Sequence, residues 1–508
     1  MSDAPLDRLR EILHEIAGLD RATAVLAWDQ ETYMPPGGVA ARASTMATLS
    51  KLAHERLIDP EVGRLLEKLE ARDLDPETDE GALVRVTRRD YDQAVKIPAE
   101  LVAEAARASS EARPVWQKAR ETSDWKLFAP YLDRNVDINR RIADALGYDE
   151  RPYDALLDRL EPGITTRQLE ALFGRLREVI VPLVREIGRR QDAVDDSILY
   201  GDWPEPAQLD FGMKVITAYG FDLEKGREDM SAHPFSIGFG AGDVRITTRV
   251  SRTFLSQALF GTMHESGHGM YSQGHAEELD GGPLWGGSSP GVHESQSRLW
   301  ENLVGRSRPL WRHFLGPLKQ AFPGRLEGVD EEAFYRAVNR VYPSLIRVEA
   351  DEVTYNLHNL LRFEIENDLL ERELKAAEVP EAWNAKVAQY LGIEVPNDAE
   401  GALQDIHWSG ISFGGFPSYT LGNVIGAQLM EAVRTAIPDL DGQIAAGEFG
   451  SLHGWLRERV YRHGRKFTPG ELLERTTGKP LDAEPWIRYL QHKFGEIYDL
   501  DAATIGVR

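Results

Sequence analysis

Two histidines and a glutamate in segment 264–268 have the spacing of a metal-binding helix. His264 and His268 are four residues apart, so in a helix both imidazoles lie on one face and can bind one ion. Glu265 lies about 100° around the helix from His264, where its carboxylate can reach a water molecule beside the ion. This His-Glu-x-x-His pattern is typical of zinc hydrolases, which need two neutral ligands, an activated water and a base.

A third protein ligand is expected on the following helix. One extension of the pattern, His-Glu-x-x-His-x-x-Gly-x-x-His, requires glycine at 271 and histidine at 274, where the chain has Tyr271 and Gly274. The segment that starts at Val292 offers Glu294 instead, and the glycine-rich stretch 280–291 lets the chain turn back towards the histidines. Two histidines and one glutamate leave a fourth position for water, as in a catalytic rather than a structural zinc site.

Mostly helical elements must position these residues. Apolar residues recur every three or four positions, which predicts helices over 5–30, 40–73, 83–122, 127–147, 167–195, 206–220, 253–273, 293–321, 331–376, 381–392, 420–446, 450–463 and 483–498. The helix after Val292 brings Glu294, Arg298 and Glu301 to one face. Segment 234–250 alternates instead and predicts a small hairpin or sheet directly before the helix of the two histidines. Nothing marks a domain boundary, so a single domain is predicted over 1–508.

Composition and charge narrow the classes of function. The 508 residues include 82 acidic and 59 basic side chains, and the net charge of −23 disfavours nucleic acid and anionic lipid as partners. The absence of cysteine excludes disulfides, thiolate metal sites and cysteine nucleophiles. Neither a signal-peptide pattern nor an uncharged apolar run of about 18 residues is present, so no membrane partner is expected and the cytoplasm is the expected location.

Further motifs follow one another along the chain. They are Trp28-Asp29 with Thr32 and Met34-Pro35, His233-Pro234-Phe235, Asp243-x-Arg245-x-Thr247, His264-Glu265-x-x-His268, His293-Glu294-Ser295-Gln296, Ile346-Arg347-x-x-Ala350-Asp351, and Gly401-x-x-Gln404-Asp405-x-His407-Trp408. In this order, and over nearly the whole chain, they resemble the carboxypeptidase Taq family of zinc metallocarboxypeptidases. The chain departs from the family pattern at none of these positions.

The resemblance implies a mainly helical fold with a deep central groove, shared broadly with neurolysin and angiotensin-converting enzyme. It also implies release of single C-terminal amino acids from peptides with broad specificity. Members typically hold one zinc ion per subunit, which cobalt can replace, and form homodimers. The N-terminal helices are then expected to cover the groove or to contribute to the dimer.

The catalytic roles follow from the motifs and the resemblance together. Zinc bound by His264, His268 and Glu294 activates water, and Glu265 takes the water proton and passes it to the leaving amine. The oxyanion needs a further donor, for which His407 and Tyr419 are the candidates, because both lie beside the glycine-rich stretch 409–417. Related helical zinc peptidases use a histidine and a tyrosine on such a loop. His407 is preferred because it lies inside a family motif.

An exopeptidase must also bind the terminal carboxylate of its substrate. Arginine is suited to this because its guanidinium group binds a carboxylate through two parallel hydrogen bonds. The candidates are Arg245, Arg249 and Arg347; Arg347, expected on a helix, is preferred for its place in the Ile-Arg-x-x-Ala-Asp motif. His233 can line the groove or serve a turn. The acids that can support the ligand histidines or these arginines are Asp243, Asp351 and Asp405.

Two alternatives remain open at this point. A related zinc oligoendopeptidase or dipeptidase would share the metal chemistry and lack a carboxylate-binding arginine. A non-catalytic scaffold would keep the fold and use its acidic surface for binding.

Overall fold

Contacts within the chain divide it into two compact units, each assembled from three separate stretches. The computed structural model describes residues 4–501. Unit 1 comprises Met1–Val95, Ser197–Val338 and Leu429–Gly478, and unit 2 comprises Lys96–Asp196, Asn339–Gln428 and Lys479–Arg508. The chain therefore passes from one unit to the other several times, and the single domain over 1–508 stays a prediction.

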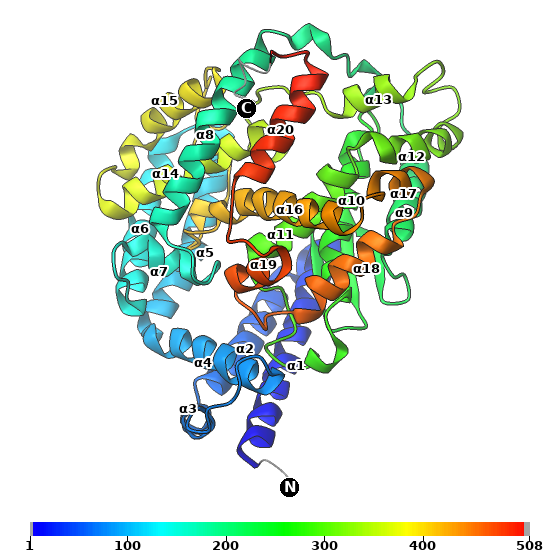
Figure 1. The fold of residues 1–508 in the computed structure, drawn as a ribbon. Helices are drawn as coiled ribbons and strands as arrows, with labels where there is room; N and C mark the ends of the chain where they lie inside the picture. The colour runs from blue at the N-terminus through cyan, green and yellow to red at the C-terminus, as the bar shows by residue number, and fades with distance from the viewer. Residues whose placement is uncertain (1–3, 502–508) are drawn as a thin grey trace. The chain divides into compact units, whose positions relative to one another are not determined.

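Unit 1 contains the predicted metal ligands and the small sheet. Its helices are α1 (Ala4–Thr32), α2 (Val39–Leu57), α3 (Pro60–Glu70), α4 (Asp79–Lys96), α9 (Glu205–Tyr219), α10 (Ser256–Gln273), α11 (Pro290–Arg298), α12 (Arg308–Ala321), α13 (Glu331–Val338), α17 (Leu440–Ala446), α18 (Gly450–Arg459) and α19 (Pro469–Thr477) (Figure 1). A π-helix over Leu299–Val304 directly follows α11.

Unit 2 contains Arg347, His407 and Tyr419. Its helices are α5 (Ala99–Thr122), α6 (Trp125–Leu146), α7 (Pro152–Asp158), α8 (Thr166–Gly188), α14 (Thr354–Glu371), α15 (Val379–Leu391) and α20 (Glu484–Ile497), and α16 (Phe416–Ala436) begins there. The mainly helical fold class is thereby confirmed. None of the helices between residues 4 and 501 combines the length and the apolar character needed to cross a bilayer.

Several predicted helices are shorter than the apolar pattern indicated, because proline and capping residues divide them. The predicted helix 40–73 is two helices, since Pro60 begins α3 and the carboxylate of Asp59 accepts a hydrogen bond from the Glu61 amide. The predicted helix 331–376 is interrupted between α13 and α14. Arg347 therefore lies in a short 3-10 helix over Arg347–Glu349, not in an α-helix. The pattern missed α7 and α19 altogether.

The sheet has three strands, one more than a hairpin. Strand β3 (Val244–Thr248) lies in the middle, antiparallel to β2 (Ser236–Gly238) and parallel to β1 (Gly226–Met230). Val244 and Ile246 of β3 are fully buried, and α10 packs against this strand. Side chains alternate along a strand, so Arg245 lies on the opposite face. The sheet therefore supports the helix of the two histidines, as predicted.

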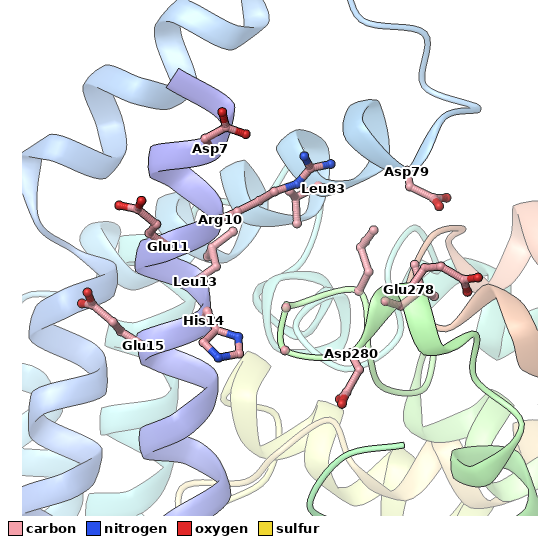
Figure 2. Close-up of a pocket in the computed structure, with 14 residues that line it drawn as sticks. Asp7, Arg10, Glu11, Leu13, His14, Glu15, Asp79, Leu83, Glu278 and Asp280 are labelled. Carbon is pink, nitrogen blue, oxygen red and sulfur yellow. The ribbon is translucent and has the colours of Figure 1, made fainter. Parts of the chain in front are cut away.

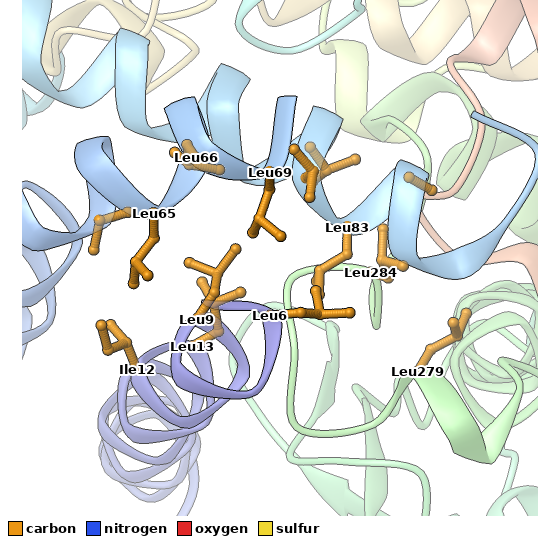
Figure 3. Packing of buried hydrophobic residues seen from close by; sticks show 14 residues of the cluster. Leu6, Leu9, Ile12, Leu13, Leu65, Leu66, Leu69, Leu83, Leu279 and Leu284 are labelled. Atoms are coloured by element: carbon orange, nitrogen blue, oxygen red, sulfur yellow. The ribbon is translucent and has the colours of Figure 1, made fainter. Parts of the chain in front are cut away.

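A hydrophobic cluster joins the N-terminal helices to the loop that leads to Glu294. Figure 3 shows leucines of α1, α3 and α4 packed together with Leu279 and Leu284, which follow α10. Both loop leucines are almost completely buried. The N-terminal helices thus fix the chain between the predicted metal ligands of α10 and the predicted ligand of α11. Their predicted contribution to a groove cover or a dimer stays a prediction.

Candidate active site and metal centre

Close packing of α10 against α11 brings the two histidines near Glu294. Gly267, inside the His-Glu-x-x-His segment, makes this possible, because a Cβ atom there would lie 2.6 Å from the carbonyl oxygen of Gln296. Helix α11 begins with Pro290, and the hydroxyl of Ser289 accepts a hydrogen bond from the amide of Val292.

The three predicted ligands converge on one point. One nitrogen of His264, one of His268 and one carboxylate oxygen of Glu294 all lie within 4.8 Å of one another. Glu294 Oε2 is 3.8 Å from His264 Nε2 and 3.5 Å from His268 Nε2. Two imidazole nitrogens and a carboxylate form a donor set that suits a divalent metal ion with an open fourth position. These residues therefore fit the ion that the sequence predicts.

The other ring nitrogen of each histidine has a partner that fixes its orientation. His264 Nδ1 donates to Glu301 Oε2 at 2.9 Å, because a carboxylate only accepts. His268 Nδ1 lies 2.6 Å from His293 Nδ1. Protons held on these Nδ1 atoms leave both Nε2 lone pairs for a metal ion. The sequence had placed Glu301 on the face of Glu294 and His293 in a motif, without giving either a role.

Two arginines hold the carboxylates of this centre in their ionised form. Arg298 donates to Glu294 Oε1 at 2.7 Å and to Glu301 Oε2 at 3.2 Å, and Arg306 approaches Glu301 at 3.3 Å. Burial raises the pKa of both carboxyls, but Arg298 and the neighbouring histidines lower it by a larger amount. The pKa of Glu294 ends well below its usual range and that of Glu301 falls to about 2.

Glu265 is a buried carboxylate without such a partner. Its side chain is 6% exposed, and Oε2 makes no hydrogen bond with any residue in the described part of the chain. Burial raises its pKa, against the opposing effect of His264 and His268. A carboxylate of raised pKa beside a candidate metal site is suited to accept a proton near neutral pH.

Arg347 of unit 2 belongs to a buried cluster with an excess of positive charge. Its Nε and Nη2 donate to Asp405 Oδ1 at 3.0 and 2.9 Å, and its Nη1 donates to Tyr355 at 3.1 Å. Arg362, which is fully buried, donates to the other oxygen of Asp405 at 2.6 Å. Two guanidinium groups therefore share one carboxylate, and a further anion would neutralise the remaining positive charge.

His407 and Tyr419, also in unit 2, lie together beside this cluster. His407 Nε2 is 3.3 Å from the hydroxyl of Tyr419, and the Arg347 guanidinium lies over the Tyr419 ring. Burial lowers the pKa of His407 to about 4, although Asp405 opposes this effect. His407 is therefore a neutral ring at physiological pH, with one N–H to donate.

The remaining predicted residues, except Asp351 of unit 2, lie on or near the sheet of unit 1. Asp243 binds Arg245 through two hydrogen bonds of 2.9 and 2.7 Å, and the rings of Trp28 and Phe239 contact the same guanidinium. The side chains that are exposed are Arg249, after β3, and His233, before β2. Of the predicted supporting acids, Asp243 and Asp405 bind arginines. Asp351 instead accepts hydrogen bonds at the start of α14, from Thr354 and the Tyr342 amide.

A cavity of about 660 Å³ lies elsewhere in unit 1, and none of the predicted site residues lines it. Figure 2 shows it beside α1, near the beginning of α4 and the loop after α10, with carboxylates such as Glu11, Asp79 and Asp280 around it. Two of its acids form ion pairs: Asp280 pairs with Arg21, and Asp79 pairs with Lys466. The candidate chemistry therefore does not lie in this cavity.

Comparison with known proteins identifies the family of this chain. The sequence model of the carboxypeptidase Taq (M32) metallopeptidases matches residues 8–494. The chain is a member of this family. Thermostable carboxypeptidase 1 of Thermus thermophilus is 43% identical across 98% of this chain and 99% of that protein. Carboxypeptidase 1 of Bacillus subtilis is 37% identical across 96% and 97%, respectively.

A solved structure of an M32 carboxypeptidase has the same fold as this chain. The crystal structure of an M32 carboxypeptidase from Deinococcus radiodurans superposes with a TM-score of 0.95 at 43% identity, over 98% of this chain and all of that one. The M32 chain described above is accordingly a metallocarboxypeptidase, a hydrolase that acts on peptides. The predicted family and activity are confirmed, which sets aside the endopeptidase and scaffold alternatives.

Replacing Glu301 by glutamine is expected to weaken metal binding by about 10- to 100-fold, because the ring of His264 loses its anionic partner. Competition with a chromophoric chelator measures the dissociation constant of the metal. The matched control is Glu327→Gln, which removes an exposed carboxylate of the same unit. Equal dissociation constants for Glu301→Gln and the parent would show that Glu301 does not support His264.

Proposed function

We propose that His264, His268 and Glu294 bind one zinc ion per subunit and that Glu265 is the general base of peptide hydrolysis. The observation that carries this proposal is the convergence of three ligand atoms within 4.8 Å, next to a buried carboxylate that pairs with no arginine among residues 4–501. Glu294 and Glu301 differ from Glu265 in this respect, since Arg298 binds both. Glu294 and Glu301, which stay ionised, are therefore distinct from Glu265, which accepts and delivers the proton.

Hydrolysis then proceeds through residues with separate tasks. Zinc, when bound, supplies Lewis acidity that makes a water molecule reactive at neutral pH. Glu265 accepts a proton from the attacking water and delivers it to the nitrogen of the leaving amino acid. His407 and Tyr419 donate hydrogen bonds to the oxygen that becomes negative during attack. A neutral His407 suits this task because the ring keeps one N–H that can donate a hydrogen bond and does not change its charge in the physiological pH range.

We propose Arg347 as the residue that binds the terminal carboxylate of the substrate. Its hydrogen bonds to Asp405 and Tyr355 use three of the five N–H groups of an arginine. The pairing of two buried arginines with one aspartate leaves a net positive charge that a substrate carboxylate would neutralise.

Arg245 is the second candidate, because Asp243 and two aromatic rings hold its guanidinium in one orientation. Asp243 then acts through Arg245. Arg249 and His233 are proposed as outer contacts of the peptide, since both side chains are exposed. The Discussion describes an assay that distinguishes the arginines.

We further propose that the enzyme is a cytoplasmic homodimer and that residues 1–508 act as a single domain. A cysteine-free chain with a net charge of −23 suits a reducing, aqueous compartment. The interleaved order of the stretches in both units supports a single domain. Sedimentation equilibrium tests the dimer, cell fractionation tests the location, and one cooperative unfolding transition in calorimetry tests the single domain.

Removal of the metal is expected to abolish the release of C-terminal amino acids, and Zn²⁺ or Co²⁺ should restore it while Mg²⁺ does not. Imidazole nitrogens suit zinc and cobalt, whereas magnesium prefers an oxygen-only environment. Elemental analysis before and after dialysis against a chelator gives the stoichiometry, and release of free amino acid gives the activity.

Variants connect the metal to its proposed ligands. His264→Ala and His268→Ala should lose the metal, whereas His492→Ala, which removes an exposed histidine of α20, should retain it. Full activity of metal-free enzyme, or full metal content in both ligand variants, would refute the proposed centre.

A further inference from the structure

A second buried carboxylate, Glu366 on α14, has no task in the mechanism above. Three donors converge on it from two other parts of unit 2. Glu366 Oε2 accepts from the hydroxyl of Tyr153 at 2.8 Å and from the amide of Gly414 at 3.1 Å. Its Oε1 accepts from the indole nitrogen of Trp408 at 3.1 Å. The side chain of Glu366 is fully buried, so water cannot replace these donors.

Two of the three donors, Trp408 and Gly414, belong to the segment that carries the proposed oxyanion donors. Trp408 directly follows His407, and Gly414 lies two residues before the start of α16, on which Tyr419 lies. Gly414 has a φ of +95°, a conformation that glycine adopts without strain, so its amide is directed by a turn that other residues disfavour. Glu366 therefore binds this segment on the C-terminal side of His407.

The same helix binds the segment on the other side of His407. One turn before Glu366, Arg362 donates to Asp405, two residues before His407. Helix α14 thus holds residues 405–414 at two points, through a cation at one and an anion at the other. Burying the charges of Arg362 and Glu366 would be costly without these partners, so the arrangement strongly favours one conformation of residues 405–414.

We propose that Glu366 is a positioning residue that sets the place of His407 and Tyr419 through Trp408 and Gly414. This inference rests on the proposed role of His407 and Tyr419 as donors to the oxyanion. Glu366 itself touches neither the substrate nor the metal ligands in this scheme. It acts by keeping two hydrogen-bond donors in the geometry that the reaction needs.

The ionised form of Glu366 is the form that fits its surroundings. The Trp408 indole and the Gly414 amide can only donate, and each faces a different oxygen of Glu366, so a proton on either oxygen would face an N–H donor. Burial raises the pKa of Glu366 to about 7, although the three hydrogen bonds and nearby Arg362 lower it. The titratable or charged groups that act on it are Tyr153 of α7 and Arg362 of its own helix. The loop segment contributes uncharged donors only, through Trp408 and Gly414.

The test replaces Glu366 by glutamine, which keeps the shape but presents an NH₂ group to at least one donor. We expect kcat to fall about tenfold or more, with KM within about twofold and with unchanged metal content, because the loop shifts while the metal centre is untouched. Glu364→Gln is the matched control on the same helix, since Glu364 binds Tyr390, Arg177 and Lys386 and not the loop. A purely structural role would lower Tm and leave kcat of the folded enzyme unchanged.

The pH profile of kcat tests the positioning role of Glu366 independently. In the parent, kcat should decline as pH falls through about 7, because protonation of Glu366 removes an acceptor from the loop. Glu366→Gln should lose the part of this decline that Glu366 causes, whereas Glu364→Gln should keep it. Tyr153→Phe removes one donor and leaves the carboxylate in place, so it should lower kcat by only a few-fold, and it keeps the test decisive if Glu366→Gln does not fold.

His407→Gln separates this inference from the proposed function. If His407→Gln retains the kcat of the parent, the role of His407 as a donor is wrong. If His407→Gln loses activity while Glu366→Gln and Tyr153→Phe both keep parental kcat and pH profile, the positioning role of Glu366 is overturned. Loss of activity in His407→Gln together with the expected kcat loss in the Glu366 and Tyr153 variants supports both.

Discussion

Glu265→Gln is expected to lower kcat by roughly 10²- to 10⁴-fold, the usual contribution of a general base, without loss of the bound metal. Glutamine keeps the shape of the side chain and cannot accept the proton of the attacking water. Within the described residues 4–501 the carboxylate of Glu265 pairs with no arginine, in contrast to Glu294 and Glu301, so its replacement leaves no arginine of that part of the chain unpaired. Steady-state release of a C-terminal amino acid measures the loss.

The control for this experiment is the metal content of the same preparation. Zinc per chain should equal that of the parent, because none of the three proposed ligands is changed. Glu278→Gln, which removes an exposed carboxylate after α10, should retain full activity. Parental kcat in a Glu265→Gln enzyme with a full complement of metal would remove Glu265 from the mechanism.

Arg347→Met is expected to remove most of the preference for a free C-terminal carboxylate. The parent should cleave an N-blocked dipeptide about 10²-fold or more faster, in kcat/KM, than the same dipeptide with an amidated C-terminus. Loss of one partner from a buried ion pair typically costs about 2–5 kcal/mol, which corresponds to this range. In the variant, Asp405 still pairs with Arg362, so the buried charges stay balanced and the fold should persist.

The pair of substrates makes this experiment a double-mutant cycle. If Arg347 binds the carboxylate, Arg347→Met and amidation remove the same interaction, and their effects should not add. Arg245→Met and Arg249→Met serve as controls with the same chemical change at the other candidates. Retention of the preference in Arg347→Met, with its loss in Arg245→Met, would transfer the role to Arg245. Equal cleavage of acid and amide by the parent would contradict carboxylate recognition by any arginine.

The convergence of the three proposed metal ligands could be predicted from the sequence because its geometry is mostly local. A four-residue spacing in one helix determines how His264 and His268 lie, and Glu294 follows within a short glycine-rich connection. Gly267 illustrates the limit of this reasoning. Its role became evident only when the carbonyl oxygen of Gln296 was found where a Cβ atom would lie.

The partners of the site residues could not be predicted, because they are distant in sequence or depend on backbone irregularities. Asp405 binds arginines 58 and 43 residues away, and no periodicity reports such pairs. Glu301 lies in a π-helix, which a regular helical pattern does not reveal. Strand β1 was missed because its sequence, Gly-Arg-Glu-Asp-Met, is polar and acquires its place only by pairing with β3.

The interleaving of the two units constrains the order in which the enzyme can mature on the ribosome. All proposed metal ligands have been synthesised by residue 294, yet the third stretch of unit 1 begins at Leu429 and ends at Gly478. Unit 2 in turn waits for a last stretch that starts at Lys479. Contacts of such long sequence separation close slowly. The nascent chain therefore carries its proposed metal-binding histidines through the synthesis of residues 269–478 before unit 1 can be completed, and a chain that stops at residue 428 carries every proposed ligand without the last stretch of that unit.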